Sequence, residues 1–241
     1  MAPQISEKYK CIFVHIPKAA GSSIEQSSIF QDQRIKFKEY VGGHTTAIEY
    51  REKYPDLFKE YFKFSLVRNP FSRLVSAYCY LLKGGSGNRY DTRIFKKYFE
   101  NSDRNFISFC RNQLSKEMVD EVVHLRPQFK FLCDDNMTIL VDFIGKQENF
   151  SQDAKKIFQK VGLKYERKHS LKSSNKHFSE YYEKDIQDKV FELYQPDFEL
   201  FGYQSEIGSY NRLLFTVDKY FTIVQKLSSK AWRKTKLILP K

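Results

Sequence analysis

Lys18 and the small residues that follow it could bind an anion. The segment 18–23 places one cation beside two alanines, a glycine and two serines, directly after an apolar, β-branched run over residues 12–16. A loop of small residues between a strand and the start of a helix offers backbone N–H groups to a phosphate-like group. We therefore predict an anion site formed by Lys18, Ala19, Ala20, Gly21, Ser22 and Ser23.

The order of residues in this loop argues against an ordinary ATP- or GTP-hydrolysing site. A Walker loop has the sequence G-x-x-x-x-G-K-[ST], in which the lysine follows the glycines. Here Lys18 precedes Gly21. A P-loop-type nucleotide or small-molecule kinase is therefore kept as an alternative, and it would also need a magnesium-binding acid that no motif of the chain supplies.

A second motif, from Arg68 to Ser76, could bind a second phosphate. Arg68 follows the apolar run 62–67, and Ser76 lies nearly two turns into the helix that Asn69 and Pro70 are expected to start. An arginine fork and a serine hydroxyl suit a phosphate group, and both could face the crevice at the carboxyl ends of parallel strands. The two motifs together fit a nucleotide that carries phosphates at two separate positions.

Histidines are the candidates for a general base. His44 lies in a Gly-Gly-His-Thr-Thr turn at the expected rim of the crevice; its alternative role is to cap the next helix. His124 is an alternative base, and the nearby Arg126 could contact the donor, the acceptor or a structural acid. His15, inside the first strand, is expected to be structural. A surface position is expected for Arg73, and surface or acceptor-side positions for His169 and His177.

These residues must be positioned by alternating strands and helices. Strands are predicted over 12–16, 62–67 and 138–144, with a further candidate over 34–41. Helices are predicted over 45–54, 70–82, 150–161 and 179–194, with a broken helical region over 93–132. The glycine-rich stretch 84–88 is expected to be a flexible, exposed loop. Because a strand, a tight turn and a helix occur in this order twice, we predict an α/β fold with a mostly parallel central sheet flanked by helices.

Length, charge and cysteine use limit the class of protein. The chain has 241 residues and a formal net charge of +12, which fits one large folded domain with a polyanionic partner such as nucleic acid, anionic lipid, a nucleotide or an acidic polysaccharide. Four widely spaced cysteines without a C-x-x-C pair predict free thiols. We predict a tail over 1–9, a catalytic domain over 10–204 and an amphipathic, basic extension over 205–241.

The chain shows no N-terminal apolar stretch long enough for a signal peptide or a membrane span, so a cytoplasmic protein is expected. The extension carries a helical pattern over 213–227 that enters a basic tail. This segment could contact anionic lipid, an acidic glycan or a partner subunit, or form a simple solvated helix.

Five segments resemble the family 2, carbohydrate-type sulfotransferases. IFVHIPKAAGSSI (12–24) is similar to their 5′-phosphosulfate loop, and FSLVRNPFSRLVSAY (64–78) is similar to their 3′-phosphate motif. Further similar segments follow in the expected order over 124–133, 141–150 and 181–203. The chain departs from the family pattern at Leu171, where relatives tend to have asparagine.

The resemblance implies a P-loop-like sulfotransferase fold and transfer of a sulfuryl group from 3′-phosphoadenosine 5′-phosphosulfate (PAPS) to a hydroxyl of a carbohydrate, either a polysaccharide or a glycolipid, without a metal. It implies that Lys18 neutralises the leaving oxygen and that Arg68 and Ser76 clamp the 3′-phosphate. It also places the catalytic base at His44, with His124 and Arg126 as candidate substrate-binding residues.

A non-catalytic, basic nucleic-acid-binding protein is the alternative outside the enzymes. It would explain the net charge, but it would not explain two phosphate motifs at strand–helix junctions. We therefore expect no nucleic-acid partner.

Overall fold

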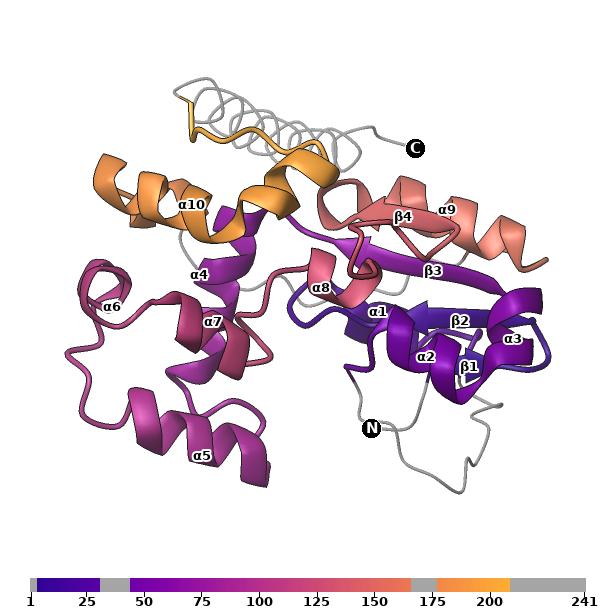
Figure 1. The fold of residues 1–241 in the computed structure, drawn as a ribbon, viewed down its shortest axis with the longest axis horizontal. Coiled ribbons are helices and arrows are strands. Elements are labelled where there is room, and N and C mark those ends of the chain that lie inside the picture. Colours follow the sequence, from indigo (N-terminus) through magenta and orange to yellow (C-terminus); the bar gives the residue numbers. More distant parts are fainter. Residues whose placement is uncertain (1–3, 31–43, 166–176, 209–241) are drawn as a thin grey trace, which may run out of the picture. The chain divides into compact units, whose positions relative to one another are not determined.

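A four-stranded sheet forms the centre of the part of the chain that the structure describes. This computed structural model describes residues 4–30, 44–165 and 177–208. The strands lie in the order β1 (Ile5–Ser6), β2 (Cys11–Val14), β3 (Phe62–Val67) and β4 (Phe143–Lys146) (Figure 1). β2, β3 and β4 run parallel, while β1 pairs with β2 in the antiparallel sense. The predicted α/β fold with a mostly parallel sheet is confirmed.

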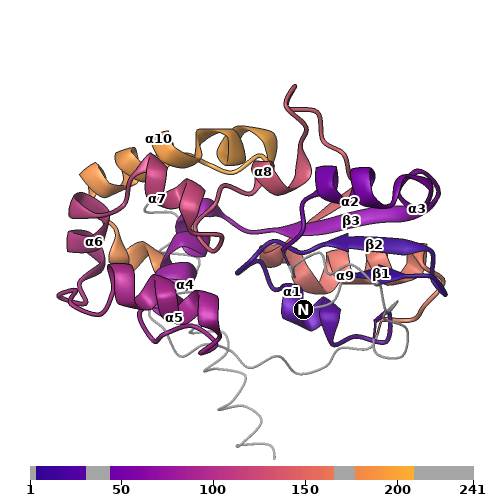
Figure 2. The ribbon, with the colours of Figure 1, turned by 60° about the horizontal axis from the view of Figure 1, so that its bottom comes forward.

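Helices cover both faces of the sheet. Side chains alternate along each strand, so neighbouring residues of one strand pack into different apolar clusters. Ile12 and Val14 belong to one apolar cluster, and Cys11 and Phe13 belong to another. The first cluster includes residues of α2 (Ala47–Lys53), α3 (Pro55–Glu60) and α8 (Phe129–Leu132); the second includes residues of α1 (Gly21–Glu25) and α9 (Phe150–Lys160). Figure 2 shows α2 and α3 on one side of the sheet and α1 and α9 on the other. The sheet is therefore the middle layer of three.

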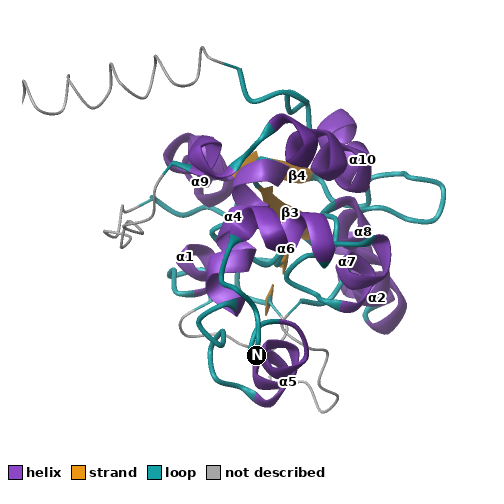
Figure 3. Cartoon of the chain, turned by 90° about the vertical axis from the view of Figure 1, so that its left-hand side faces the viewer, coloured by secondary structure: helices purple, strands orange, loops and turns teal. Residues whose placement is uncertain are grey.

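A second group of helices follows the carboxyl end of β3. Its members are α4 (Pro70–Leu81), α5 (Arg89–Tyr98), α6 (Phe106–Asn112), α7 (Lys116–Glu121) and α10 (Lys184–Leu200). α10 packs against α4, α6 and α8 (Figure 3). Two short 3₁₀ turns, Gln147–Asn149 and Phe178–Tyr181, precede α9 and α10. The second group of helices therefore lies next to the strand ends at which the predicted phosphate motifs are found.

The two predicted helix starts next to the site are confirmed in detail. Thr46 caps α2: its hydroxyl accepts from the Glu49 N–H, and the Glu49 carboxylate accepts from the Thr46 N–H. Asn69 caps α4 by accepting from the Ser72 N–H, and Pro70 occupies the first helical position. The sequence thus specifies locally where the chain leaves the turns that carry His44 and Arg68.

Several predicted boundaries differ from the structure, among them the start of the helix predicted over 179–194, which begins at Lys184 after a 3₁₀ turn. The fourth strand is β4, which begins at Phe143, because Asp142 instead binds the Lys63 backbone through its N–H and its carboxylate. α10 does not end before Pro196 but continues to Leu200, with a kink at Tyr194 that accommodates the proline. Residues 5–6, inside the predicted N-terminal tail, form β1 and are buried.

The remaining predictions about the chain ends and segments are tested only in part. The candidate strand 34–41, the polar segment around His169 and Leu171, and the helical pattern 213–227 lie outside the described residues. All described helices and strands belong to one compact unit that ends at Tyr203. Among the described residues, no helix has the length and apolar character needed to cross a membrane. The four cysteines are free thiols, as predicted.

Candidate functional site

The loop that follows β2 has a strained backbone at the predicted anion site. Lys18 and Ala20 have positive φ angles of 67° and 65°, a conformation that residues with a Cβ seldom adopt. Such outliers persist where the surrounding structure holds them, and they concentrate at functional sites. Ala19 is buried and Ser22 is exposed, so the loop places its apolar residues inward and a hydroxyl outward.

Gly21 lets this loop pass over a buried pair of side chains. A Cβ at Gly21 would lie 2.1 Å from the His15 ring. His15 Nδ1 lies 3.0 Å from Glu25 Oε1, and the same oxygen accepts from Gln4 Nε2 at 2.7 Å. β2 ends at Val14, so His15 lies just after the strand and not inside it. Its packing between Gly21 and Glu25 agrees with the predicted structural role.

Replacing Gly21 by alanine is expected to destabilise the protein by roughly 1–3 kcal/mol, the usual cost of overpacking. The clash with His15 is expected to outweigh the better helix propensity of alanine. Thermal unfolding followed by circular dichroism measures this. Ala20→Gly is the matched control, because it relieves a positive φ and should leave stability unchanged or raised. A Gly21→Ala variant as stable as the wild type would contradict the close packing.

Lys18 lies half-buried at the centre of the site. Its Nζ lies 4.0 Å from the centroid of the Tyr80 ring, a cation–π contact. Burial, with a further contribution from the positive charge of Arg68, lowers the pKa of Lys18 to about 8. The ammonium is therefore charged at neutral pH but close to its titration, and a bound anion would favour its charged form.

Arg68 connects the second phosphate motif to the first. Its guanidinium donates to the Ser72 hydroxyl at 2.7 and 2.9 Å and to the Lys18 carbonyl at 3.3 Å. The Gln128 side chain fixes the Arg68 backbone by accepting from its N–H and donating to its carbonyl. Ser76, the serine predicted to bind a phosphate together with Arg68, lies one turn further along α4 than Ser72 and is half-buried.

Three imidazole rings form a row beside the loop. The rings of His15 and His44 lie 4.9 Å apart, and those of His44 and His124 lie 5.8 Å apart, both edge-to-face. At one end of the row His15 pairs with Glu25; at the other end His124 Nδ1 lies 3.8 Å from Asp91 Oδ1. The structure thus brings His44 and His124, the two candidate bases, into one cluster.

His44 has the tautomer and charge that a general base requires. Its Nδ1 lies 3.3 Å from the His15 carbonyl, which can only accept, so Nδ1 carries the proton and Nε2 carries the lone pair. Burial, followed by the influence of His15, lowers the pKa of His44 to about 3. The ring is therefore neutral at physiological pH. Helix capping, the alternative role, belongs to Thr46.

Arg73 corrects a prediction, because it is not a surface charge. Only 2% of Arg73 is exposed, and its guanidinium donates to the carbonyls of Pro17 at 3.0 Å and His124 at 3.4 Å. The buried Asp197 supplies a nearby negative charge. Arg73 thereby ties the anion loop to the segment that carries His124.

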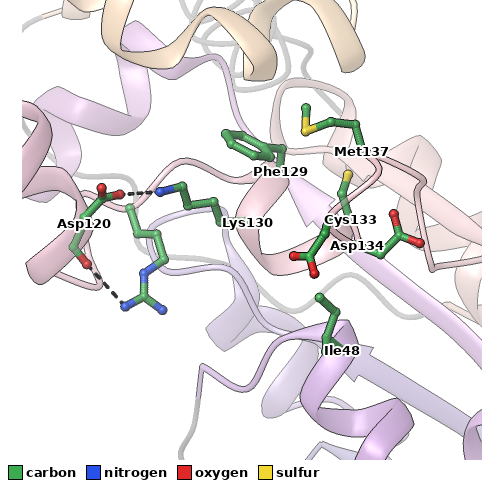
Figure 4. Close-up of a pocket in the computed structure, with 9 residues that line it drawn as sticks. Ile48, Asp120, Phe129, Lys130, Cys133, Asp134 and Met137 are labelled. Atoms are coloured by element: carbon green, nitrogen blue, oxygen red, sulfur yellow. Dashed lines mark hydrogen bonds and ion pairs between the residues drawn. The ribbon is translucent and has the colours of Figure 1, made fainter.

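A cavity of about 520 Å³ lies between α2, α7 and α8 (Figure 4). Its wall includes an aromatic ring, Phe129, and several charged side chains, among them Arg126. Asp120 pairs with Lys130 and accepts from Arg126 through its carbonyl at 3.4 Å. Ile48 is the second residue of α2, and Arg126 lies two residues after His124, but the residues that line the cavity do not include His15, His44 or His124.

The structure adds residues that the sequence patterns did not single out. Tyr80 lies against Lys18, Glu25 pairs with His15, Gln128 fixes Arg68 and Asp91 faces His124. Tyr80 lies two residues after the segment 64–78, Glu25 directly follows the segment 12–24, and Gln128 lies inside the segment 124–133, so spacing could have indicated them; Asp91 lies in no motif. Among the described residues, no group of histidine, cysteine, aspartate and glutamate could hold a metal ion.

Comparison with known proteins identifies relatives over most of the chain. The chain is 27% identical over 229 residues to carbohydrate sulfotransferase 14 of Danio rerio, a match that covers 83% of this chain and 61% of the relative. It is 24% identical over 233 residues to carbohydrate sulfotransferase 11 of Mus musculus, with 83% and 66% covered. An uncharacterized protein of Archaeoglobus fulgidus is 27% identical over 107 residues, with 44% of this chain and 72% of the relative covered.

The chain thus spans about three fifths to two thirds of the length of the two named sulfotransferases. No solved structure matches the chain. The family model described as "Sulfotransferase family" matches residues 4–204, which include both phosphate motifs and the histidine row. Together with the α/β fold, this match shows that the chain belongs to the sulfotransferase family.

Proposed function

We propose that this protein transfers a sulfuryl group from PAPS to a hydroxyl of a carbohydrate. The observation that carries the proposal is the convergence of Lys18, Arg68 and the neutral His44 on one loop. The names of the two relatives, both carbohydrate sulfotransferases, support the choice of acceptor class.

On the donor side, the residues of this chain fit a nucleotide with two anionic ends. The tight turn at Lys18 and Ala20, with the hydroxyls of Ser22 and Ser23, would hold the 5′ end. Because α1 is only five residues long, the loop groups and Lys18 must supply most of the attraction, not a helix dipole. Arg68 would bind the 3′-phosphate, with Ser76 as a second donor from α4.

On the acceptor side, His44 Nε2 would take the proton of the attacking hydroxyl. Lys18 would neutralise the charge that develops on the bridging oxygen as the S–O bond breaks. This division of tasks is mostly positioning plus electrostatic stabilisation, as in phosphoryl transfer. It requires that a sugar reach His44. The cavity between α2, α7 and α8, which does not itself include His44, has an aromatic ring, Phe129, and a hydrogen-bond donor, Arg126, in its wall.

Isothermal calorimetry with 3′-phosphoadenosine 5′-phosphate, the desulfated donor, tests the donor site. Arg68→Ala is expected to weaken binding by about tenfold to a hundredfold, because hydrogen bonds to charged groups contribute roughly 1.5–3 kcal/mol. Arg111→Ala is the matched control, since Arg111 is an exposed arginine that pairs with Glu183 and Asp185. Equal affinity of the Arg68→Ala variant and the wild type would remove Arg68 from the site.

The acceptor class requires a separate assay. Transfer of radiolabelled sulfate from PAPS should be measured with polysaccharides, glycolipids and small glycosides in parallel. Transfer to one of these classes, lost in the Arg68→Ala variant, is the expected result. A protein that binds the desulfated donor but sulfates none of the carbohydrates would contradict the acceptor class and leave the donor site in place.

A further inference from the structure

Asp91 is a buried carboxylate whose two oxygens have different surroundings. Oδ2 accepts from the Tyr80 hydroxyl at 2.7 Å, from the N–H and the hydroxyl of Ser86 at 2.9 Å each, and from the Asn88 amide at 2.9 Å. Oδ1 has no hydrogen-bond partner within the described part of the chain. The carboxylate is thus held in place through one oxygen, and the other is available.

The loop 84–88 is exposed at Ser86, Gly87 and Asn88, as its composition predicted, and its inner side encloses Asp91. Gly85 has a φ of 65°, and a Cβ there would lie 2.5 Å from Asp91 Oδ2. Burial raises the pKa of Asp91, but hydrogen bonds from Ser86 and Tyr80 outweigh this effect and bring the pKa below its ordinary value. Asp91 is therefore ionised at neutral pH, although only 1% of it is exposed.

The available oxygen of Asp91 faces an imidazole nitrogen that is also unpaired. His124 Nδ1 lies 3.8 Å from Asp91 Oδ1, and it has no hydrogen-bond partner among the described residues. The His124 side chain is 8% exposed, so water does not replace the missing partner freely. A buried polar group without a partner costs about 1–3 kcal/mol, which favours closure to the ~2.7–3.2 Å of a hydrogen bond.

We propose that Asp91 is a positioning residue that acts through His124 and Tyr80. Through Oδ1 it fixes His124 as the Nδ1–H tautomer, so that Nε2, on the far side of the ring, carries the lone pair. Through Oδ2 it fixes Tyr80, whose ring lies 4.0 Å from Lys18 Nζ. One carboxylate therefore positions a group on the donor side and a group on the acceptor side.

The role of His124 in this inference, which is to bind the sugar, rests on the proposed function. Its ring lies 5.8 Å from that of His44, so the two rings can contact neighbouring groups of one ligand. With Nε2 as an acceptor, His124 takes a hydrogen bond from a second hydroxyl of the sugar whose first hydroxyl reacts at His44. The substrate class that fits is a carbohydrate with adjacent hydroxyl groups.

The tautomer of His124 can be measured without any ligand. In ¹⁵N-labelled protein, the imidazole nitrogen shifts distinguish a protonated Nδ1 from a protonated Nε2, and His124→Gln assigns the signals. We expect a protonated Nδ1 in the wild type. A protonated Nε2 in the wild type would overturn the proposal, and this arm needs no variant of Asp91 to fold.

The substitution Asp91→Asn should reverse the tautomer. Four donors surround Oδ2, so the amide oxygen must take that place and the amide N–H₂ must face His124 Nδ1. His124 then becomes the Nε2–H tautomer, and we expect turnover to fall about tenfold to a hundredfold with donor affinity within about twofold. Asp188→Asn, in an exposed pair with Lys184, is the matched control.

A double-mutant cycle separates positioning from a general loss of structure. If Asp91 acts through His124, Asp91→Asn should cause no further loss of turnover in a His124→Gln background. Full additivity of the two losses would contradict the proposal. If the wild type does not bind 3′-phosphoadenosine 5′-phosphate, the proposed function fails, whereas the tautomer measurement still decides whether Asp91 and His124 form a pair.

Discussion

Replacing His44 by alanine is expected to lower sulfuryl transfer by ~10²–10⁴-fold, the usual contribution of a general base. The affinity for 3′-phosphoadenosine 5′-phosphate should change by no more than about twofold, because His44 is proposed to contact the acceptor hydroxyl and not the donor. The physical reason is the fixed tautomer: Nδ1–H donates to the His15 carbonyl, so Nε2 is ready to accept a proton without rearrangement. Single-turnover transfer and calorimetry on the same preparation measure the two quantities.

The control for this variant is His177→Ala. His177 lies half-buried before the 3₁₀ turn Phe178–Tyr181, where its Nδ1 contacts the Ser179 hydroxyl, and it belongs to no part of the histidine row. Turnover of His177→Ala should match that of the wild type. Partial recovery of the His44→Ala variant by added imidazole would support the role of a base. Normal turnover of the His44→Ala variant would remove His44 from the mechanism.

Lys18→Ala is expected to reduce transfer by ~10²–10³-fold, comparable with removal of one transition-state hydrogen-bond donor. Its effect on donor affinity should be smaller, because Lys18 meets its full negative charge only as the bridging oxygen becomes a leaving group. Lys59→Ala, an exposed lysine of α3, is the matched control. A loss of donor affinity with unchanged turnover would instead show that Lys18 binds the donor equally in the ground state and the transition state and does not act at the bond that breaks.

The pKa of Lys18 makes this site pH-dependent in a defined direction. Burial lowers that pKa to about 8, so the free protein loses the positive charge as the pH rises through 8. kcat/KM should therefore be constant near neutral pH and fall above pH 8, and this basic limb should vanish in Lys18→Ala. On the acid side, the pKa values of about 3 for His44 and about 4 for His124 predict no limb near pH 6.5. A limb near pH 6.5 would show that another group controls the reaction.

Local patterns were sufficient to predict the elements that carry the phosphate motifs. The strand 62–67 has the bounds predicted, and Asn69 and Pro70 start the next helix as expected, because a cap and a proline act on their immediate neighbours. The expected convergence of both motifs followed from parallel strands, whose carboxyl ends share one edge of a sheet. The contact between the Arg68 guanidinium and the Lys18 carbonyl is the result.

Features that depend on distant partners could not be predicted in this way. Arg73 lies off the apolar face of its predicted helix and is therefore expected at the surface, yet its acceptors are carbonyls 56 and 51 residues away in the sequence. Asp91 follows a glycine-rich stretch that composition assigns to a flexible loop, but backbone and side-chain donors of that stretch bind its carboxylate. Neither periodicity nor composition carries information on such pairings.

The buried Arg73 also links the folding of the protein to its ability to bind a donor. One guanidinium bridges Pro17 and His124, so the native shape of the anion loop depends on a helix and a segment that are distant from it in the sequence. A donor that binds only this native arrangement would therefore stabilise the folded unit against unfolding. A donor present at about 100 times its dissociation constant would accordingly stabilise the whole unit by about 2.7 kcal/mol, and thermal shift becomes a screen for nucleotides.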